Sequence, residues 1–135
     1  MKFLDLNGLK YFLKFIDRTV TVSSNQYQFN SQGRREIPFI TNHQIIKMNS
    51  SGNIDVYNWL KDASEGGILE IIFVGAQGGN LYCTYQGSSL MYKMSGGPHG
   101  PYLENIDYLQ TIYNTYTRLI KSGKKLVVAE FVENK

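Results

Sequence analysis

The sequence predicts a single α+β domain, in which an N-terminal helix precedes a mostly antiparallel β-sheet and one long amphipathic helix lies near the C-terminus. Three observations predict this fold class. Apolar residues recur at helical spacing at the start of the chain and again between residues 103 and 121. Between these segments, short runs alternate apolar and polar residues, which is typical of half-buried strands. Short turns separate the runs, and no internal repeat or long linker divides the chain.

The N-terminal segment predicts a division into an attachment or oligomerisation helix, residues 1–18, and an α+β body domain, residues 19–135. A helix over residues 6–17 carries apolar side chains around most of its circumference. A helix that packs on its own domain needs to bury only about a third of its surface. We therefore expect partner chains to cover the rest, although a central helix wrapped by its own sheet is the alternative. The expected interface residues are Leu6, Leu9, Phe12, Leu13 and Ile16.

The body is predicted to place strands around a short helix. Alternation over residues 19–30 predicts a strand pair, and residues 68–96 contain three strand-like runs that we expect to form an antiparallel meander. Residues 56–63 combine helical spacing with a glycine stop at Gly66, which predicts a short helix. The last run, from residue 124, predicts a strand that returns to the sheet.

The long amphipathic helix is predicted from Leu103 to Gly123. Acidic residues near its start and basic residues near its end match the helix dipole, and Gly123 closes it. Its apolar face has spacings of three and four residues and comprises Ile106, Leu109, Tyr113, Tyr116 and Ile120.

Length, composition and charge limit the function classes. The chain has 135 residues, of which 42% are hydrophobic, so one domain can bury a core without disulfides. The net charge of +3 is mild and predicts no nucleic-acid partner. Cys83 is the only cysteine, which excludes an intrachain disulfide and a thiolate zinc cluster. Because no run is long and apolar enough to span a membrane, and charges interrupt the apolar N-terminus, we expect a soluble protein with no signal peptide and no membrane partner.

No catalytic site, cofactor or metal site is predicted. His43 and His99 have no metal-ligating residue at a suitable spacing, and the alternating pattern around Cys83 indicates a small core residue. The glycine-rich run FVGAQGGNL precedes a strand-like run and predicts a turn, since a phosphate loop leads into a helix. A small enzyme whose residues meet only in space is the alternative, with His43, His99, Cys83 and Glu70 as its chemical groups.

The opening phrase FLDLNGLKYFLKFI resembles a recurring N-terminal pattern of tailed-bacteriophage virion proteins, especially fibre, collar and tail-associated proteins. The pattern is Leu-Asp-Leu, a small polar residue, Gly-Leu and an aromatic-rich helical stretch with lysines, and it occupies the first fifteen or so residues here. The resemblance implies a non-enzymatic virion structural protein, a head-fibre, collar or adaptor subunit attached to the head or tail. It also implies synthesis in the bacterial cytoplasm, a homo-oligomer, with a trimer favoured over a dimer, and other virion proteins as partners.

A carbohydrate- or receptor-binding module is the alternative function. The chain contains ten Tyr, seven Phe and one Trp, and tyrosine rings suit sugar platforms as well as oligomer seams because the ring packs while the hydroxyl stays in water. The run SGGPHGPY alternates flexible and restricted backbone, as shaped binding loops do. The candidate ligand residues are Trp59, Pro98, His99 and Tyr102.

Overall fold

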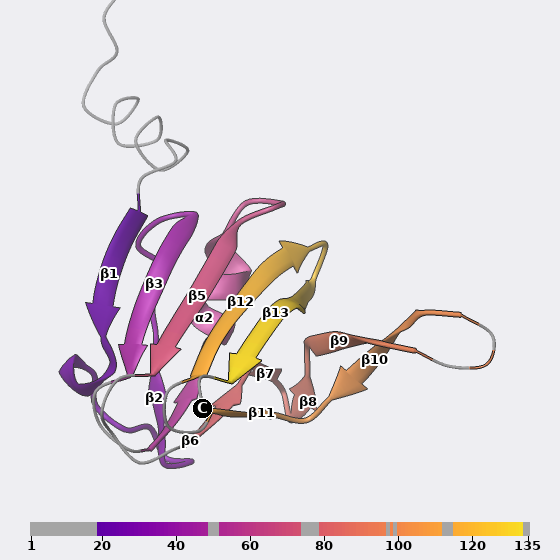
Figure 1. The fold of residues 1–135 in the computed structure, drawn as a ribbon. Helices are drawn as coiled ribbons and strands as arrows, with labels where there is room; N and C mark the ends of the chain where they lie inside the picture. Colours follow the sequence, from indigo (N-terminus) through magenta and orange to yellow (C-terminus); the bar gives the residue numbers. More distant parts are fainter. Residues whose placement is uncertain are drawn as a thin grey trace, which may run out of the picture.

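A computed structural model describes residues 19–48, 52–73, 79–96, 98, 100–111 and 115–133 (Figure 1). This part of the chain is mostly β-sheet, with a short 3-10 helix, η1 (Ser24–Gln26), and a short α-helix, α2 (Tyr57–Asp62). The strands are β1 (Thr19–Ser23), β2 (Arg34–Glu36), β3 (His43–Met48), β4 (Asn53–Asp55), β5 (Ile68–Phe73), β6 (Gly79–Tyr82), β7 (Thr84–Tyr85), β8 (Ser88–Ser89), β9 (Met91–Ser95), β10 (Tyr102–Ile106), β11 (Leu109–Thr111), β12 (Thr115–Ser122) and β13 (Lys125–Glu133).

Two mixed sheets and one small hairpin contain these strands. Sheet A has seven strands in the order β1-β3-β5-β12-β13-β9-β10, and sheet B has four in the order β11-β6-β4-β2. Strands β7 and β8 form the separate hairpin. In Figure 1, α2 lies behind β5 and β12, and the opposite face of these strands is turned to the viewer.

The first six strands alternate between the two sheets. The odd-numbered strands β1, β3 and β5 are parallel neighbours in sheet A, and the even-numbered strands β2, β4 and β6 are parallel neighbours in sheet B. The chain therefore completes three turns of a two-sheet coil, as in solenoid proteins. The sheet A strands of successive turns begin at Thr19, His43 and Ile68. The structure repeats without a visible repeat in the sequence, because each turn needs only the same alternation of buried positions.

The core lies between sheet A on one side and sheet B with α2 on the other. Strand β5 alternates half-buried and buried residues along its whole length, so Leu69, Ile71 and Phe73 point inward. Trp59 and Leu60 of α2 and Leu81 of β6 meet them in one buried cluster. The half-buried positions of the outer face of sheet A include several isoleucines, namely Ile45, Ile68, Ile72 and Ile120.

The β9–β10 hairpin projects from this body as an arm (Figure 1). At its base Met91 is fully buried, and the Asn105 side-chain amide donates to the carbonyls of Ser89 and Met91 at 3.0 and 3.2 Å. Strand β9 pairs with β13 only over residues 91–93, so it separates from the sheet beyond Lys93. The arm is therefore held firmly at one end while the rest of it extends from the sheet.

The predicted long C-terminal helix is wrong. Strands β10, β11 and β12 occupy its span in the described residues, with Ile106 in β10, Leu109 in β11, and Tyr116 and Ile120 in β12. Tyr113 lies outside the described residues. The helical spacing arose because apolar residues of separate strands fell three and four positions apart. Within β12, Thr117 and Leu119 are buried and their neighbours are half-buried, which is the two-residue period of a strand.

Gly123 starts a hairpin turn and does not end a helix. Ser122 pairs with Lys125 across a two-residue loop, and Gly123 has a φ of 63°. Glycine with positive φ at the first loop position is the pattern of a type II′ turn, which matches the twist of antiparallel strands. The chain therefore reverses directly from β12 into β13.

The remaining fold predictions have mixed outcomes. The short helix over residues 56–63 is confirmed as α2, and the returning last strand as β13. The mostly antiparallel sheet is wrong, since five strand pairs are parallel and five are antiparallel. The three runs do contain β5, β6 and β9, but these strands do not pair with one another, so the predicted meander is wrong. The predicted N-terminal helix lies outside the described residues.

Candidate functional site

Two tyrosines stacked at the surface form the centre of the candidate site. Tyr57 is the first residue of α2, and Tyr85 is the last residue of β7. Their ring centroids are 4.9 Å apart and the rings are nearly parallel, with an interplanar angle of 16°. Tyr85 is about half exposed, at 50%, so the pair presents aromatic surface to solvent. We call Tyr57 and Tyr85 the tyrosine pair.

The tight turn between β7 and β8 fixes the position of Tyr85. Tyr85 pairs with Ser88, and the two residues between them, Gln86 and Gly87, have φ values of 51° and 80°. Positive φ at both loop positions defines a type I′ turn, which joins two strands with the correct twist. Tyr85 is therefore held at the tip of a short, regular hairpin.

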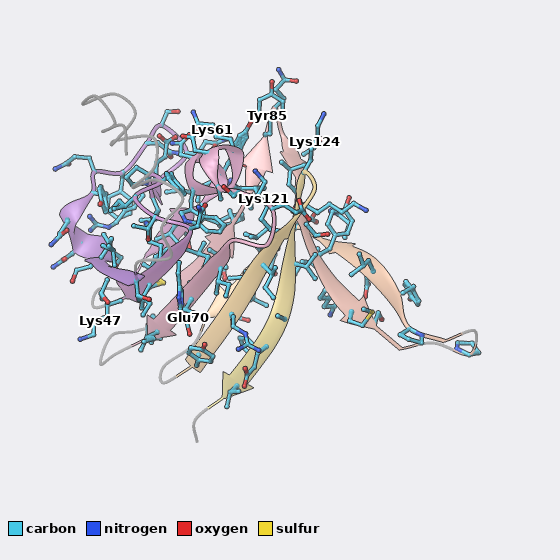
Figure 2. All side chains as sticks on the ribbon, turned by 90° about the horizontal axis from the view of Figure 1, so that it is seen from above. Lys47, Lys61, Glu70, Tyr85, Lys121 and Lys124 are labelled. Atoms are coloured by element: carbon cyan, nitrogen blue, oxygen red, sulfur yellow. The ribbon has the colours of Figure 1, made fainter. Side chains whose placement is uncertain are left out.

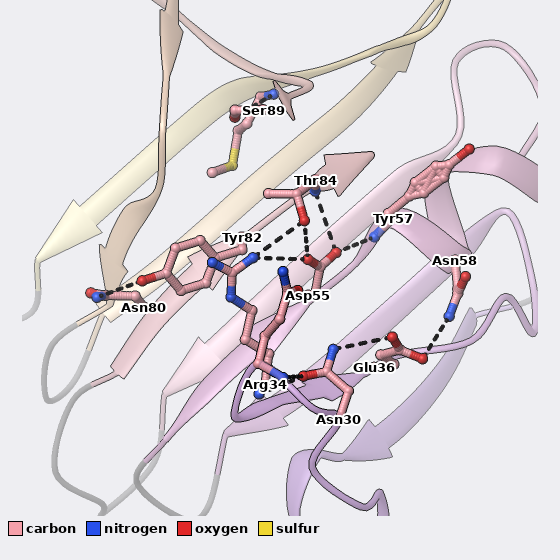
Figure 3. A network of polar contacts seen from close by, with 12 residues as sticks. Asn30, Arg34, Glu36, Asp55, Tyr57, Asn58, Asn80, Tyr82, Thr84 and Ser89 are labelled. Atoms are coloured by element: carbon pink, nitrogen blue, oxygen red, sulfur yellow. Dashed lines mark hydrogen bonds and ion pairs between the residues drawn. The ribbon is translucent and has the colours of Figure 1, made fainter. Parts of the chain in front are cut away.

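Asp55, the last residue of β4, forms hydrogen bonds with both of the segments that carry the tyrosine pair (Figure 3). Its Oδ1 accepts hydrogen bonds from the backbone amides of Tyr57, at 3.0 Å, and Thr84, at 3.4 Å. Its Oδ2 accepts from the Thr84 hydroxyl at 2.7 Å and pairs with the Arg34 guanidinium at 3.4 Å. Because Asp55 is almost fully buried, these contacts satisfy a charge that would otherwise be costly.

A hollow of about 270 Å³ lies on one side of the tyrosine pair. Its polar groups include the Glu36 carboxylate, which accepts hydrogen bonds from the amides of Asn30 at 3.1 Å and Asn58 at 3.3 Å (Figure 3). We call it the acidic hollow. Its lining residues are Asn30, Gln32, Glu36, Asp55, Tyr57, Asn58, Lys61, Thr84 and Tyr85.

A larger hollow of about 500 Å³ also borders the tyrosine pair. It has an apolar floor and a basic rim, and we call it the basic hollow. Figure 2 shows Lys61, Lys121 and Lys124 near Tyr85, on the α2 side of sheet A, whereas Lys47 and Glu70 lie on the opposite side. The lining residues are Tyr57, Leu60, Lys61, Tyr85, Leu90, Lys121, Gly123 and Lys124.

Lys121 already has partners at the C-terminal end of α2. Its ammonium donates hydrogen bonds to the carbonyls of Leu60, at 2.8 Å, and Ala63, at 2.5 Å. A cation at this end also complements the negative end of the helix dipole. Lys61 and Lys124 are exposed and form no ion pair within the described part of the chain. These two lysines are therefore the ones available to a ligand.

A second polar cluster lies on the outer face of sheet A and involves four neighbouring strands. Glu70 of β5 accepts a hydrogen bond from the Tyr116 hydroxyl of β12, and its other oxygen lies 2.5 Å from Nε2 of His43 on β3. The hydroxyl of Thr19 on β1 lies 3.1 Å from Nδ1 of His43. Burial and the hydrogen bond to Glu70 raise the pKa of Tyr116 to about 12, so its hydroxyl remains a donor.

The residues predicted for an enzyme do not share one site. His43 and Glu70 are in contact, but both described hollows lie elsewhere. Cys83 is fully buried in the core, as predicted, and burial raises the pKa of its thiol, followed by the charge of Asp55. His99 lies outside the described residues. The described residues contain no group of three metal-ligating side chains and no helix long and apolar enough to cross a membrane.

The predicted ligand residues are also dispersed. Trp59 is fully buried, and its indole N–H donates to the Thr41 carbonyl at 3.0 Å, so it offers no ring to a ligand. Pro98 and Tyr102 are exposed at the arm, away from the tyrosine pair. The predicted interface residues Leu6, Leu9, Phe12, Leu13 and Ile16 all lie outside the described residues.

Sequence reasoning missed the tyrosine pair. Two local signals point to its parts: the Gln-Gly turn after Tyr85, and Asp55 two residues before the helix. Nothing local places the two tyrosines together, because they are 28 positions apart and meet through Asp55. Comparisons with profiles of known protein families, with curated proteins and with solved structures found no match to this chain.

Proposed function

We propose that this chain is a non-enzymatic structural subunit that assembles with copies of itself, as a fibre, collar or adaptor protein of a bacteriophage virion. The observation that carries the assembly role is the apolar surface of the β9–β10 arm. The virion assignment rests on the N-terminal sequence pattern, and it includes attachment to the head or tail through residues 1–18.

The arm has one apolar face that its own body leaves in solvent. Met94 pairs with Leu103 across the hairpin, so their side chains share a face, and Tyr92 lies on the same face two residues before Met94. Met94 is 61% exposed and Leu103 is 40% exposed. Burying such side chains in a partner contributes on the order of 1–2 kcal/mol each. A projecting hairpin with this face favours contact with a second copy.

The neighbouring edge of sheet A offers a matching surface. Beyond Val128, β13 has no pairing with β9, so this edge of the strand is open within the described residues. Phe131 and Val132, which lie on this part of β13, are both exposed. Open edges accept additional strands through backbone hydrogen bonds. The arm of one copy can therefore add to the open edge of the next.

Substitutions on the arm test the assembly role. Replacing Met94→Asp and Leu103→Asp together should weaken self-association at least about a hundredfold, because each change removes apolar burial and places a charge in the contact. Light scattering coupled to size-exclusion chromatography measures the mass. Ser95→Asp is the control on the opposite face of the hairpin and should leave the mass unchanged. A monomeric wild-type chain would contradict the proposal.

Carbohydrate binding is a second candidate function, favoured by the tyrosine pair. A half-exposed ring between two hollows suits a sugar, since the ring contacts the apolar face of the sugar and the surrounding polar groups contact its hydroxyls. The site differs from the one predicted from sequence, because Tyr57 and Tyr85 replace Trp59 and the SGGPHGPY loop. A module of this kind is compatible with a structural subunit that also contacts a host surface.

A further inference from the structure

The two hollows beside the tyrosine pair differ in the charge that they present. The basic hollow is lined by Lys61, Lys121 and Lys124 and by no carboxylate. Glu65 lies nearby and accepts a hydrogen bond from the Gly123 amide at 2.7 Å, but it does not line the hollow. The acidic hollow shares Lys61 with the basic hollow, but it also contains the carboxylates of Glu36 and Asp55. An anionic group is therefore favoured more in the basic hollow than in the acidic hollow, where two carboxylates lie beside the shared lysine.

The basic hollow combines this charge with apolar surface. Its floor includes Leu60 and Leu90, and the half-exposed ring of Tyr85 borders it. Lys121 is engaged by backbone carbonyls, whereas Lys61 and Lys124 extend from separate elements, α2 and the β12–β13 turn. Two ammonium groups that line one hollow from different elements favour an anionic group inside it.

The acidic hollow suits the uncharged part of the same ligand. Glu36 already accepts hydrogen bonds from Asn30 and Asn58, which leaves amide oxygens and remaining carboxylate lone pairs for sugar hydroxyls. Asp55 is occupied by Arg34, Thr84 and two backbone amides. This side therefore accepts hydrogen bonds and disfavours anions.

We propose that the tyrosine pair binds a glycan with an anionic sugar unit, whose ring packs on Tyr85 and whose carboxylate or phosphate lies between Lys61 and Lys124. The neutral units that follow extend into the acidic hollow. This proposal rests on the second candidate function, carbohydrate binding, and adds the ligand class and its orientation. The charge difference between the hollows determines which end of the glycan enters which side.

Binding of matched charged and neutral sugars tests the proposal. Isothermal titration calorimetry on the full chain compares trigalacturonate with its trimethyl ester, which keeps the rings and removes the charge. We expect the acid to bind at least about tenfold more tightly, and added salt to reduce the difference. Galactose 6-phosphate against galactose shows whether a phosphate serves as the anionic group.

Variants identify the residues. Lys61→Gln with Lys124→Gln should abolish the preference for the acid over the ester, while Tyr85→Ala should weaken the binding of both. Lys47→Gln is the matched control, because Lys47 is also exposed and lies on the opposite side of sheet A (Figure 2). Circular dichroism checks that each variant folds. If a variant fails to fold, the comparison of acid with ester on the wild-type chain still tests the proposal.

The outcomes distinguish failure of this proposal from failure of carbohydrate binding and from failure of the assembly role. Equal affinity for charged and neutral sugars would overturn the anionic ligand and keep carbohydrate binding. Failure of all these sugars to bind would contradict both, while the mass measured by light scattering would still test assembly independently. Tighter binding of a single-stranded oligonucleotide than of any sugar would overturn the proposal, since lysines beside an aromatic ring also suit nucleic acid.

Discussion

Glu70 holds three strands of sheet A together through its side chain. It accepts a hydrogen bond from Tyr116 on β12 and contacts His43 on β3, while its own strand, β5, lies between them. Burial acts to raise the pKa of Glu70, but the hydrogen bonds from Tyr116 and His43 outweigh it, so the pKa is lowered from its ordinary value of 4.5. The ionised form is therefore the one that the fold stabilises.

This lowered pKa predicts how stability depends on pH. A carboxyl whose pKa is lower in the folded state contributes stability that is fully present above its unfolded pKa and is lost as pH falls through its folded pKa. Glu70→Gln should therefore reduce the free energy of unfolding by about 1–2 kcal/mol at pH 7. The difference from the wild type should shrink as pH falls below 4.5 and through the lowered folded-state pKa of Glu70, where the wild-type carboxyl also becomes neutral.

Urea denaturation at neutral and acidic pH measures both values. Glu104→Gln is the control, because Glu104 is exposed on the arm, and it should change stability by less than about 0.5 kcal/mol at either pH. A difference between the Glu70 variant and the wild type that stays constant with pH would show that the ionised carboxylate has no special role.

At the scale of an element, the β7–β8 hairpin determines whether Tyr85 can stack on Tyr57. Gly87 has a φ of 80°, and a Cβ built there would meet no atom within 4 Å. Gly87→Ala should therefore reduce the free energy of unfolding by about 1 kcal/mol through backbone strain alone. Gly87→Asn should cost less, because asparagine tolerates the left-handed conformation.

Thermal unfolding of both variants checks this prediction, and near-ultraviolet circular dichroism reports on the tyrosine pair. Gly96 is the matched control, since its site is equally open and its φ is not in the left-handed region. Gly96→Ala should be close to neutral. Equal losses of stability in Gly87→Ala and Gly96→Ala would mean that the left-handed conformation of Gly87 does not account for the effect of its substitution.

At the scale of the whole molecule, the assembly that we propose involves the N-terminal segment as well as the arm. Among the described residues, the buried core cluster extends from Ile37 to Leu126, and all its members belong to the body domain. Deleting residues 1–18 should therefore lower the native mass and leave a folded body. The physical reason is that the predicted helix is apolar around most of its circumference and needs partners to cover it.

Light scattering of the deleted chain measures this change. Lys10→Asp in the full chain is the control, since Lys10 lies on the predicted polar stripe and should tolerate a charge reversal without loss of mass. An unchanged mass after the deletion would leave the arm as the assembly contact and remove the role proposed for the N-terminal segment.

The sequence by itself determined features that depend on near neighbours. The run ILEIIF, followed by a glycine-bearing turn, predicted a strand, and β5 forms there with half-buried and buried residues in alternation. The short helix at residues 56–63 and the buried Cys83 were also predicted correctly, because local spacing is enough to indicate them. No catalytic residue, cofactor or metal was predicted, and those predictions stay untested.

Only the tertiary structure decided between strand and helix over residues 103–121, and only it brought Tyr57 and Tyr85 together. Apolar spacing there fitted a helix, but Tyr116, Thr117 and Ile120 gain their backbone partners from β5, which lies about 50 residues earlier in the chain. A sheet is stabilised by such distant pairs, whereas a helix closes its hydrogen bonds within four residues. The same long-range pairing formed two sheets from strands that alternate along the chain. It also brought Tyr57 and Tyr85 together, because Asp55 accepts hydrogen bonds from the backbone amides of Tyr57 and Thr84.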